Sequence, residues 1–505
     1  MKQKTPYHKL CELSKERHAW KTVADLLHWD QEIYMPEKGA TFRAYQNALI
    51  AVKLHQCEIS PQFKRLLSQV INLTTGDVLD SSLSSEEQKA LLLWRKDYLH
   101  QKKIPSSFIS EFTTLTLNAV SVWIEARNQN SFALFEPYLE KIVRLSQEKC
   151  KHLSYQDHPY DALLEEYEPG CTVAKLTPLF NALKENLCAL LKQIQAAPSV
   201  DSAFLQRECD PDLQFAWGKK LLSIIGFDPA ASRLDHAHHP SCSGFYPSDI
   251  RMTTRIDKNN FISNIYSVLH EGGHGLYARG LPLAHYGTPL GEQASMSIDE
   301  SQSRLWETRI GRSYAFWEYA LPLLQEALPP LQGLSLSAFY QGINHVTPSF
   351  IRVEADEVTY CLHIILRFEI ERDLISGALL VKDVPRVWRE KMEELLGISP
   401  PSDTLGALQD IHWSLGYFGY FPTYALGNLY ASQMFNSFLE TNPEWSKQLS
   451  QGNFSLLHTW LEKHIYQYGR QFSPDELIFN ISKNPLSEAA FTGYLTKKYQ
   501  AIYAF

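Results

Sequence analysis

The sequence lacks long apolar runs and a basic excess. No stretch of about 18 apolar residues occurs in its 505 residues, and the first residues contain no apolar segment of the signal-peptide type. We therefore expect no membrane span. The formal net charge is −8, whereas nucleic-acid-binding proteins usually carry a basic balance or patch. The charge thus argues against nucleic-acid binding.

Paired cysteine motifs are also missing. The eight cysteines are spread along the chain, and none forms a CxxC pair. Reduced thiols suit this pattern better than a disulfide framework, so a cytoplasmic location is expected.

Strand-type alternation is scarce, and helical spacing of apolar residues dominates. Such spacing occurs around residues 9–30, 133–150, 173–195 and 360–376. The one strand candidate is 245–257, and loops are expected near 196–203, 228–248 and 281–294. Internal repeats, low-complexity segments and a clear interdomain linker are absent. These features predict one continuous, mainly α unit over residues 1–505, with at most a small β element.

The run HEGGH at 270–274 is the first feature that indicates chemistry. A helix over 261–279, capped by Asn260, places His270 and His274 on one face, where two imidazoles can bind a single ion. Glu271 lies near that ion and can accept a proton from the water it activates. Gly272 and Gly273 cost roughly 1.5–2 kcal/mol of helix propensity. A close approach of another backbone or of a substrate would explain them.

A catalytic zinc site needs a third protein ligand, and Glu300 is the candidate. Two local alternatives stay open at this point. Ser297 and Glu300 match a capping box, and Glu300 with Arg304 matches an i,i+4 ion pair.

Several motifs, taken in order, resemble the carboxypeptidase Taq family of metallocarboxypeptidases. They are LLHWDQEIYMP (26–36), YDALLEEYEPG (160–170), HPS (239–241), DIRMT (249–253), HEGGH (270–274), ESQSR (300–304), IRVEADEVTY (351–360) and GALQDIHWSLGYFGYFPTYALGN (406–428). Each shorter string is weak evidence alone, but the ordered series covers most of the chain and is specific.

The resemblance implies a large helical, saddle-like fold with two lobes that flank a deep active-site groove. It further implies a homodimer, one divalent metal per chain (zinc, with cobalt as the alternative) and removal of C-terminal residues from peptides. Glu300 matches the family's third ligand. Two departures stand out: Asp299 replaces the family's His before that Glu, and Ser241 replaces Phe in the family's His-Pro-Phe. They bear on the surroundings of the metal and on the substrate wall.

An arginine suits the substrate's terminal carboxylate because its guanidinium can bind bidentately. Arg352 is the first candidate, from the IRVEAD segment, and Arg251 is the second, from DIRMT. Pairing with a structural acid is the alternative for each.

The remaining site candidates are His412, Tyr420, Tyr424 and His239. His412 is a catalytic candidate because it can hydrogen-bond the oxyanion, while packing beside Trp413 is its alternative. Tyr420 and Tyr424 can bind a peptide carbonyl or an oxyanion, or simply belong to the core. His239 matches a family motif and lines the groove in that interpretation.

Two other clusters have plainer interpretations. His236, His238 and His239 are expected to be exposed or bonded to backbone rather than to hold a second metal. Glu165, Glu166 and Glu168 are interpreted as a solvated helix end.

The predicted function is therefore a metallocarboxypeptidase. His270, His274 and Glu300 hold the ion, and Glu271 moves the proton from water to the leaving amine. An endo-acting metallo-oligopeptidase would use the same ligands. A helical scaffold with a decayed site is a third hypothesis, which the intact ligand set disfavours.

Overall fold

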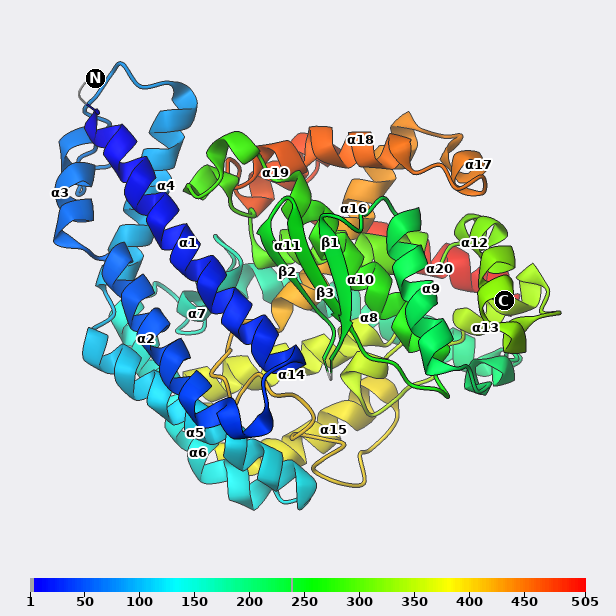
Figure 1. The fold of residues 1–505 in the computed structure, drawn as a ribbon. Coiled ribbons are helices and arrows are strands. Elements are labelled where there is room, and N and C mark those ends of the chain that lie inside the picture. Colours follow the sequence, from blue (N-terminus) through cyan, green and yellow to red (C-terminus); the bar gives the residue numbers. More distant parts are fainter. Residues whose placement is uncertain (1–3, 238) are drawn as a thin grey trace.

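The computed structural model describes residues 4–237 and 239–505, and helices dominate it (Figure 1). The helices before the sheet are α1 (Pro6–Ile33), α2 (Ala40–Glu58), α3 (Pro61–Val70), α4 (Ser85–Lys102), α5 (Ser106–Asn128), α6 (Phe132–Leu153), α7 (Asp161–Tyr167), α8 (Val173–Ala196) and α9 (Pro211–Ile224). The helices after it are α10 (Phe261–Gly280), α11 (Met296–Arg304), α12 (Tyr314–Ala327), α13 (Leu336–Ile343), α14 (Tyr360–Ser376), α15 (Val384–Leu396), α16 (Pro422–Thr441), α17 (Trp445–Leu449), α18 (Ser455–His464), α19 (Pro474–Ser482) and α20 (Ala489–Tyr503). The mainly helical fold class predicted from the sequence is confirmed.

Helix starts follow local capping chemistry. Thr5 accepts a hydrogen bond from the His8 amide at the start of α1, and Pro6 occupies the first turn. Thr172 caps α8 in the same way, as its sequence position suggested. The four segments with helical spacing lie within α1, α6, α8 and α14.

A three-stranded sheet lies beside α10. Its order is β1 (Ser232–His236), β3 (Asp249–Thr254) and β2 (Ser241–Tyr246), with β1 parallel and β2 antiparallel to β3. The predicted strand near 245–257 is confirmed as β3. The loop predicted over 228–248 is wrong, because β1 and β2 form there by pairing with β3.

Small residues and polar bonds hold α10 against this sheet. A side-chain carbon added at Gly244 of β2 would lie 2.6 Å from Ala278 Cβ, so only glycine permits this approach. The Thr254 hydroxyl at the end of β3 donates to Asn264 Oδ1 of α10 at 2.8 Å. The sheet therefore fixes the position of the helix that carries the HEGGH run.

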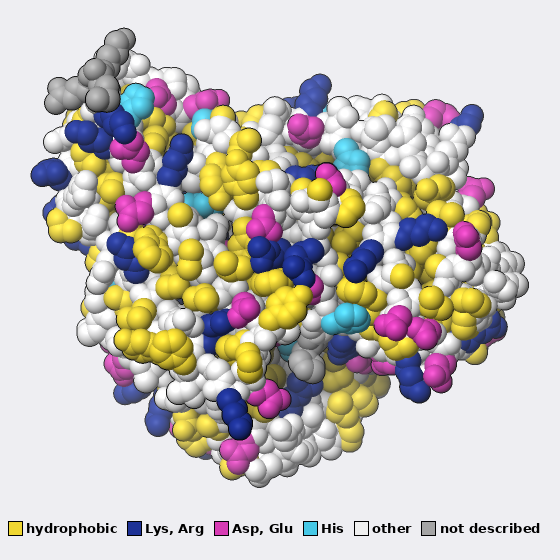
Figure 2. All heavy atoms as spheres, viewed as in Figure 1, with side chains coloured by type: hydrophobic (Ala, Val, Ile, Leu, Met, Phe, Trp, Pro, Cys, Tyr) yellow, Lys and Arg dark blue, Asp and Glu magenta, His cyan; other side chains and the backbone are white. Residues whose placement is uncertain are grey.

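Two apolar cores are present among the described residues. The larger one extends from α5 to α20, and a smaller one is enclosed by α1, α3 and α4 together with Leu290. All eight cysteines are free. No helix in the described part of the chain is both long and apolar enough to cross a membrane. On the face shown in Figure 2, hydrophobic side chains gather over the region of α1 and α2.

Candidate metal centre

Helix α10 presents both histidines of the HEGGH run. It begins at Phe261, where Asn260 accepts a hydrogen bond from the Ser263 amide, and it ends at Gly280, as predicted. His270 and His274 lie one turn apart, and their ring centroids are 5.0 Å apart.

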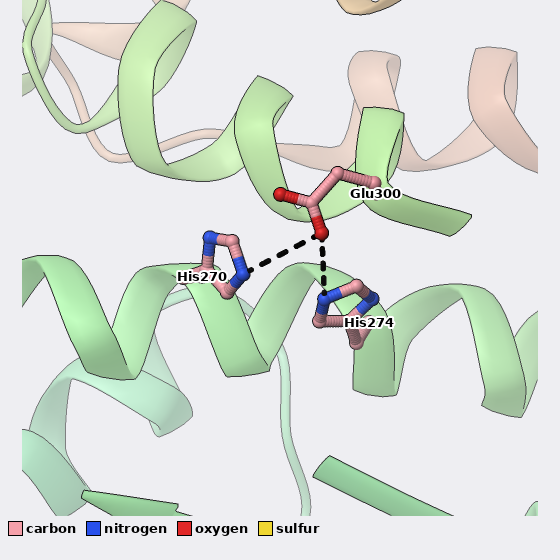
Figure 3. Close-up of side chains that lie close together, drawn as sticks. All are labelled: His270, His274 and Glu300. Atoms are coloured by element: carbon pink, nitrogen blue, oxygen red, sulfur yellow. Dashed lines mark ion pairs between the residues drawn. The ribbon is translucent and has the colours of Figure 1, made fainter. Parts of the chain in front are cut away.

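Glu300 reaches the two histidines from α11 (Figure 3). Its Oε2 lies 3.8 Å from His270 Nε2 and 3.6 Å from His274 Nε2. Both local alternatives are wrong. Ser295, not Ser297, caps α11, and Arg304 pairs with Glu307 rather than with Glu300.

The three side chains fit a divalent ion. Their ligand atoms lie within 4.8 Å of one another, and this is the one such group among residues 4–237 and 239–505. Ligand atoms at about 2.0–2.2 Å from a tetrahedral ion lie roughly 3.3–3.6 Å from each other, close to the separations found here. Glu300 is 5% exposed, and its buried Oε1 has no hydrogen-bond partner among the described residues. A bound cation would compensate that buried oxygen.

The glycine pair is explained mainly by a neighbouring backbone. A side-chain carbon at Gly273 would lie 2.5 Å from Gln302 O and 2.5 Å from Ser303 Cα, both backbone atoms of α11. At Gly272 the same carbon would meet the side chain of Ile225 at 2.6 Å. Gly273 therefore lets α10 and α11 approach closely enough to share a site.

A carboxylate behind His270 was missed in the sequence. Glu307 lies in the π-helix η5 (Leu305–Ile310), and its Oε2 is 2.8 Å from His270 Nδ1. Arg304 donates to the same oxygen at 2.7 Å and to Asn428 Oδ1 at 3.1 Å. Burial alone would raise the pKa of Glu307, but Arg304 and His270 hold it well below its usual range. Glu307 therefore orients His270 with Nε2 toward Glu300.

Asp299 stands behind the second histidine. Its Oδ1 lies 3.1 Å from His274 Nδ1, although His274 Nδ1 makes no hydrogen bond of good geometry within the described chain. Asp299, which replaces the family's His, thus adds negative charge close to the site. Unlike Glu307 beside His270, it makes no directed hydrogen bond to its histidine.

Glu271 follows His270 in α10 and is buried, with 6% of its surface exposed. Burial raises the pKa of Glu271, while His270 and His274 act in the opposite direction. A carboxylate with a raised pKa in such a place is suited to proton transfer near neutral pH.

His412 and Tyr424 form a hydrogen-bonded pair. The Tyr424 hydroxyl and His412 Nε2 are 3.2 Å apart, and Tyr420 packs edge-on against Tyr424 with centroids 5.3 Å apart. Burial lowers the pKa of His412 to about 3, so its imidazole is neutral at physiological pH. His412 Nδ1 is buried without a hydrogen-bond partner among the described residues.

Arg352 and Arg367 share one carboxylate. Arg352 Nη2 and Arg367 Nη2 lie 2.9 Å and 2.5 Å from opposite oxygens of Asp410. Against the upward effect of burial, the two guanidiniums hold the pKa of Asp410 well below its usual range. Two buried cations face one anion here, which leaves a positive charge uncompensated within this trio. Arg352 also lies over the Tyr424 ring at 4.9 Å, so this charge adjoins the His412 pair.

Arg251 has a structural partner. Its Nε and Nη2 donate to the two oxygens of Asp249 at 2.9 Å and 3.0 Å, and its guanidinium stacks on Trp29 at 4.4 Å. His239 is exposed, and its carbonyl accepts a hydrogen bond from Thr253, whose hydroxyl also contacts Ser241. The structure therefore brings His270, His274 and Glu300 together, and it places Arg251 and His239 at the sheet.

Two plainer interpretations are tested as well. The solvated helix end is wrong for Glu168, which is 4% exposed and accepts from the Tyr430 hydroxyl at 3.0 Å, and burial raises its pKa to about 7. Glu166 is also mostly covered and pairs with Lys149. In the histidine cluster, His236 stacks on Phe215, while His238 lies outside the described residues.

Known proteins are similar to this chain over nearly its whole length. A family model for carboxypeptidase Taq (M32) metallopeptidases matches residues 9–499. Thermostable carboxypeptidase 1 of Thermus thermophilus is 38% identical over 515 residues, covering 100% of both chains. Carboxypeptidase 1 of Bacillus subtilis is 37% identical over 496 residues, covering 97% of each chain. The crystal structure of the M32 carboxypeptidase from Deinococcus radiodurans R1 matches with a TM-score of 0.95 and 34% identity, covering 99% of this chain and 100% of that one.

Proposed function

The chain belongs to the carboxypeptidase Taq (M32) family of metallopeptidases and is a metal-dependent carboxypeptidase, and from this we propose which of its residues carry out the reaction. We propose that His270, His274 and Glu300 hold one divalent ion. The observation that carries this proposal is the convergence of their ligand atoms within 4.8 Å of one another, with both histidines directed at Glu300 Oε2 and with the other oxygen of this carboxylate buried without a hydrogen-bond partner among the described residues.

We propose zinc as the ion, with cobalt as the alternative. Two imidazole nitrogens and one carboxylate are a common catalytic zinc set. When bound, such an ion supplies Lewis acidity and lowers the pKa of a water molecule at its open position.

Glu271 is the proposed general base. It is buried on the same helix as both histidines, and its raised pKa matches a group that takes a proton from water and then delivers it to the leaving amine.

His412, Tyr420 and Tyr424 are proposed to serve the scissile carbonyl. A neutral His412 and the Tyr424 hydroxyl are both hydrogen-bond donors, and their 3.2 Å contact means that either one can orient the other. Arg352, which pairs with Asp410, adjoins this pair, since its guanidinium lies over the Tyr424 ring at 4.9 Å.

Arg352 is the proposed anchor for the substrate's C-terminal carboxylate. Three of its five N–H groups are directed to Asp410 and Tyr360, so two remain for a ligand. The uncompensated charge beside Asp410 favours an anion at this place. Arg251 is a weaker proposal because Asp249 already occupies its bidentate edge.

Other aspects of the proposal rest on the resemblance. They are a groove flanked by two helical lobes within one domain, His239 as part of its lining, assembly as a homodimer and a cytoplasmic location. The free state of all eight cysteines agrees with the last of these.

A peptide pair with a free or amidated C-terminus tests the anchoring role. With zinc or cobalt added, we expect mass spectrometry to show stepwise shortening of the free peptide and no change in the amide. Equal cleavage of both would assign the chemistry to an endopeptidase and defeat the role of Arg352.

The variant Glu271→Gln tests the general base. It should retain stoichiometric metal, because Glu271 is not among the proposed ligands, and lose about 10²–10⁴-fold in kcat. Near-normal turnover by a metal-loaded Glu271→Gln protein would remove Glu271 from the mechanism.

A further inference from the structure

Tyr360 lies between two buried arginines that serve different parts of the candidate site. It is the first residue of α14 and is 7% exposed. Arg352 Nη1 donates to its hydroxyl at 3.1 Å, and the guanidinium of Arg304 lies over its ring, 4.0 Å from the centroid. Arg352 is the proposed substrate anchor. Arg304 donates to Glu307, which orients His270. One side chain therefore adjoins both the substrate anchor and the support of the metal site.

The surroundings of Tyr360 hold it in place. Asp356 accepts hydrogen bonds from the amides of Val358 and Thr359 at 2.9 Å and 3.0 Å. The Asp356 carbonyl accepts from the Tyr360 amide at 3.0 Å, and the Tyr424 ring packs edge-on against the Tyr360 ring with centroids 6.4 Å apart. Both the backbone and the ring of Tyr360 are thus fixed by neighbours, so Tyr360 can in turn hold the two arginines.

Tyr360 limits how each arginine can turn. Arg352 directs Nε and Nη2 to Asp410, and among the described residues Tyr360 is the acceptor for its Nη1. Arg304 directs Nη1 to Glu307, and the Tyr360 ring covers the flat face of its guanidinium. Without Tyr360, each guanidinium could pivot about the carboxylate that it binds.

The two contacts use different parts of the tyrosine. The hydroxyl accepts a hydrogen bond from a charged guanidinium, and such a bond is about twice as strong as one between neutral groups. The ring face attracts the cation of Arg304 through its quadrupole, and this attraction is strongest where water is excluded, as around the 6% exposed Arg304. The hydroxyl and the ring can therefore be removed one at a time by substitution.

We infer that Tyr360 is a positioning residue for both halves of the site: its hydroxyl sets Arg352 to receive the substrate's carboxylate, and its ring holds Arg304 behind the metal site. This inference rests on the proposed function and adds to it a residue that acts through the two arginines. A tyrosine that only filled the core would affect metal, substrate and stability together. A positioning residue affects each half of the site through a different group.

Tyr360→Phe removes the hydroxyl and keeps the ring. With zinc-loaded protein, the KM for peptides with a free C-terminus should rise about five- to tenfold and kcat should stay nearly unchanged, because the lost bond serves ground state and transition state alike. Zinc affinity in competition with a chromogenic chelator should match that of the wild type.

Tyr503→Phe is the matched control. Tyr503 is 5% exposed, and its hydroxyl likewise accepts one hydrogen bond, from the Val346 amide at 2.9 Å. Tyr503→Phe should leave both KM and zinc affinity unchanged. A rise in KM equal to that of Tyr360→Phe would show that loss of any such buried hydroxyl has this effect, and would overturn the inference.

A double-variant cycle shows whether the Tyr360 hydroxyl acts through Arg352. In an Arg352→Lys background, Tyr360→Phe should raise KM little further, because the guanidinium that the hydroxyl orients is already gone. Two effects that simply multiply would overturn this half of the inference.

Tyr360→Leu removes the ring as well as the hydroxyl. It should weaken zinc binding about tenfold in the chelator assay, because Arg304 loses the ring that holds it against Glu307. Tyr360→Met repeats the measurement with a longer side chain that leaves a smaller cavity and still lacks an aromatic face. Guanidinium unfolding of the metal-free proteins shows whether each variant folds.

The outcomes separate this inference from the proposed function. An unchanged KM in Tyr360→Phe with a raised KM in Arg352→Lys would overturn the role of the hydroxyl and leave the anchor standing. Wild-type zinc affinity in Tyr360→Leu and Tyr360→Met, with weakened zinc binding in Glu307→Gln, would overturn the role of the ring alone. Wild-type behaviour of both Arg352→Lys and Glu307→Gln would overturn the inference together with the roles on which it rests.

Discussion

Adding one methyl group at Gly273 should weaken metal binding through the backbone of α11. The new carbon would lie 2.5 Å from Gln302 O and from Ser303 Cα, whereas ordinary contacts begin at 3.4 Å. Backbone atoms cannot rotate aside, so α10 and α11 must separate by about 0.9 Å or distort by a similar amount. Glu300 lies on α11 only two residues before Gln302, and it moves with that segment.

The magnitude follows from competing terms. Alanine gains about 1 kcal/mol of helix propensity over glycine, and overpacking costs about 1–3 kcal/mol, so the metal-free fold should lose at most about 2 kcal/mol. Metal sites tolerate changes of only about 0.2 Å in ligand distance. A shift several times larger should weaken zinc binding at least about 100-fold, or about 2.7 kcal/mol.

Gly272→Ala is the matched control. Its added carbon meets Ile225 Cδ1, the end of a flexible side chain, so the two helices can keep their separation. We expect its zinc affinity to stay within about threefold of wild type. Competition with a chromogenic chelator gives both affinities, and guanidinium unfolding of the metal-free proteins gives both stabilities. Equal affinities for the two variants would refute the role assigned to Gly273.

Three further changes probe the surroundings of the site. Glu307→Gln should weaken zinc binding about 10–100-fold in the same chelator assay because it removes the charge that orients His270, and Asp299→Asn should have the smaller effect; the reverse order would contradict the contacts described. Arg352→Lys should lower kcat/KM for peptides with a free C-terminus about 10–100-fold and leave zinc affinity in the chelator assay unchanged, and a matching loss of zinc affinity would point to misfolding instead. Burial raises the pKa of Glu168 from 4.5 to about 7, so the folded state binds this proton more tightly and stability falls as pH rises through that window. Glu168→Gln should make this fall shallower by up to about 3 kcal/mol in denaturant titrations, and an unchanged slope would show that Glu168 titrates normally.

The helices were predictable because their signals are local. Asn260 and Thr172 act as caps where the sequence suggested, and apolar spacing identified α1, α6, α8 and α14. Strands β1 and β2 were not predictable, because they contain histidine, serine and glycine without clear alternation of apolar and polar residues. Their stability comes from pairing with β3 and from packing near α10, which are contacts between distant parts of the chain.

In the candidate site, too, the features set by local sequence were predictable and those set by distant contacts were not. The spacing of His270 and His274 is a local property of a helix, and the resemblance supplied Glu300. The position of Glu307 beside His270 depends on a π-helical turn that no local sequence pattern predicts. Its spacing of seven residues from Glu300 was nevertheless a usable signal. The partner of Arg352 is 58 residues further along the chain, so the sequence indicated the arginine but not the buried charge balance around Asp410.

Because of the π-helix η5, the number of residues between Glu300 and Glu307 matters for the support of His270 as much as their identity. A π turn contains one residue more than an α turn. Deleting Leu305 or Trp306, the two η5 residues that precede Glu307, would move Glu307 by one position, which is about 100° around the axis of an α-helix. All three proposed ligands would survive such a deletion, and His270 alone would lose its support. A one-codon change could thus turn a well-ordered site into a loosely held one while every recognisable motif stayed intact.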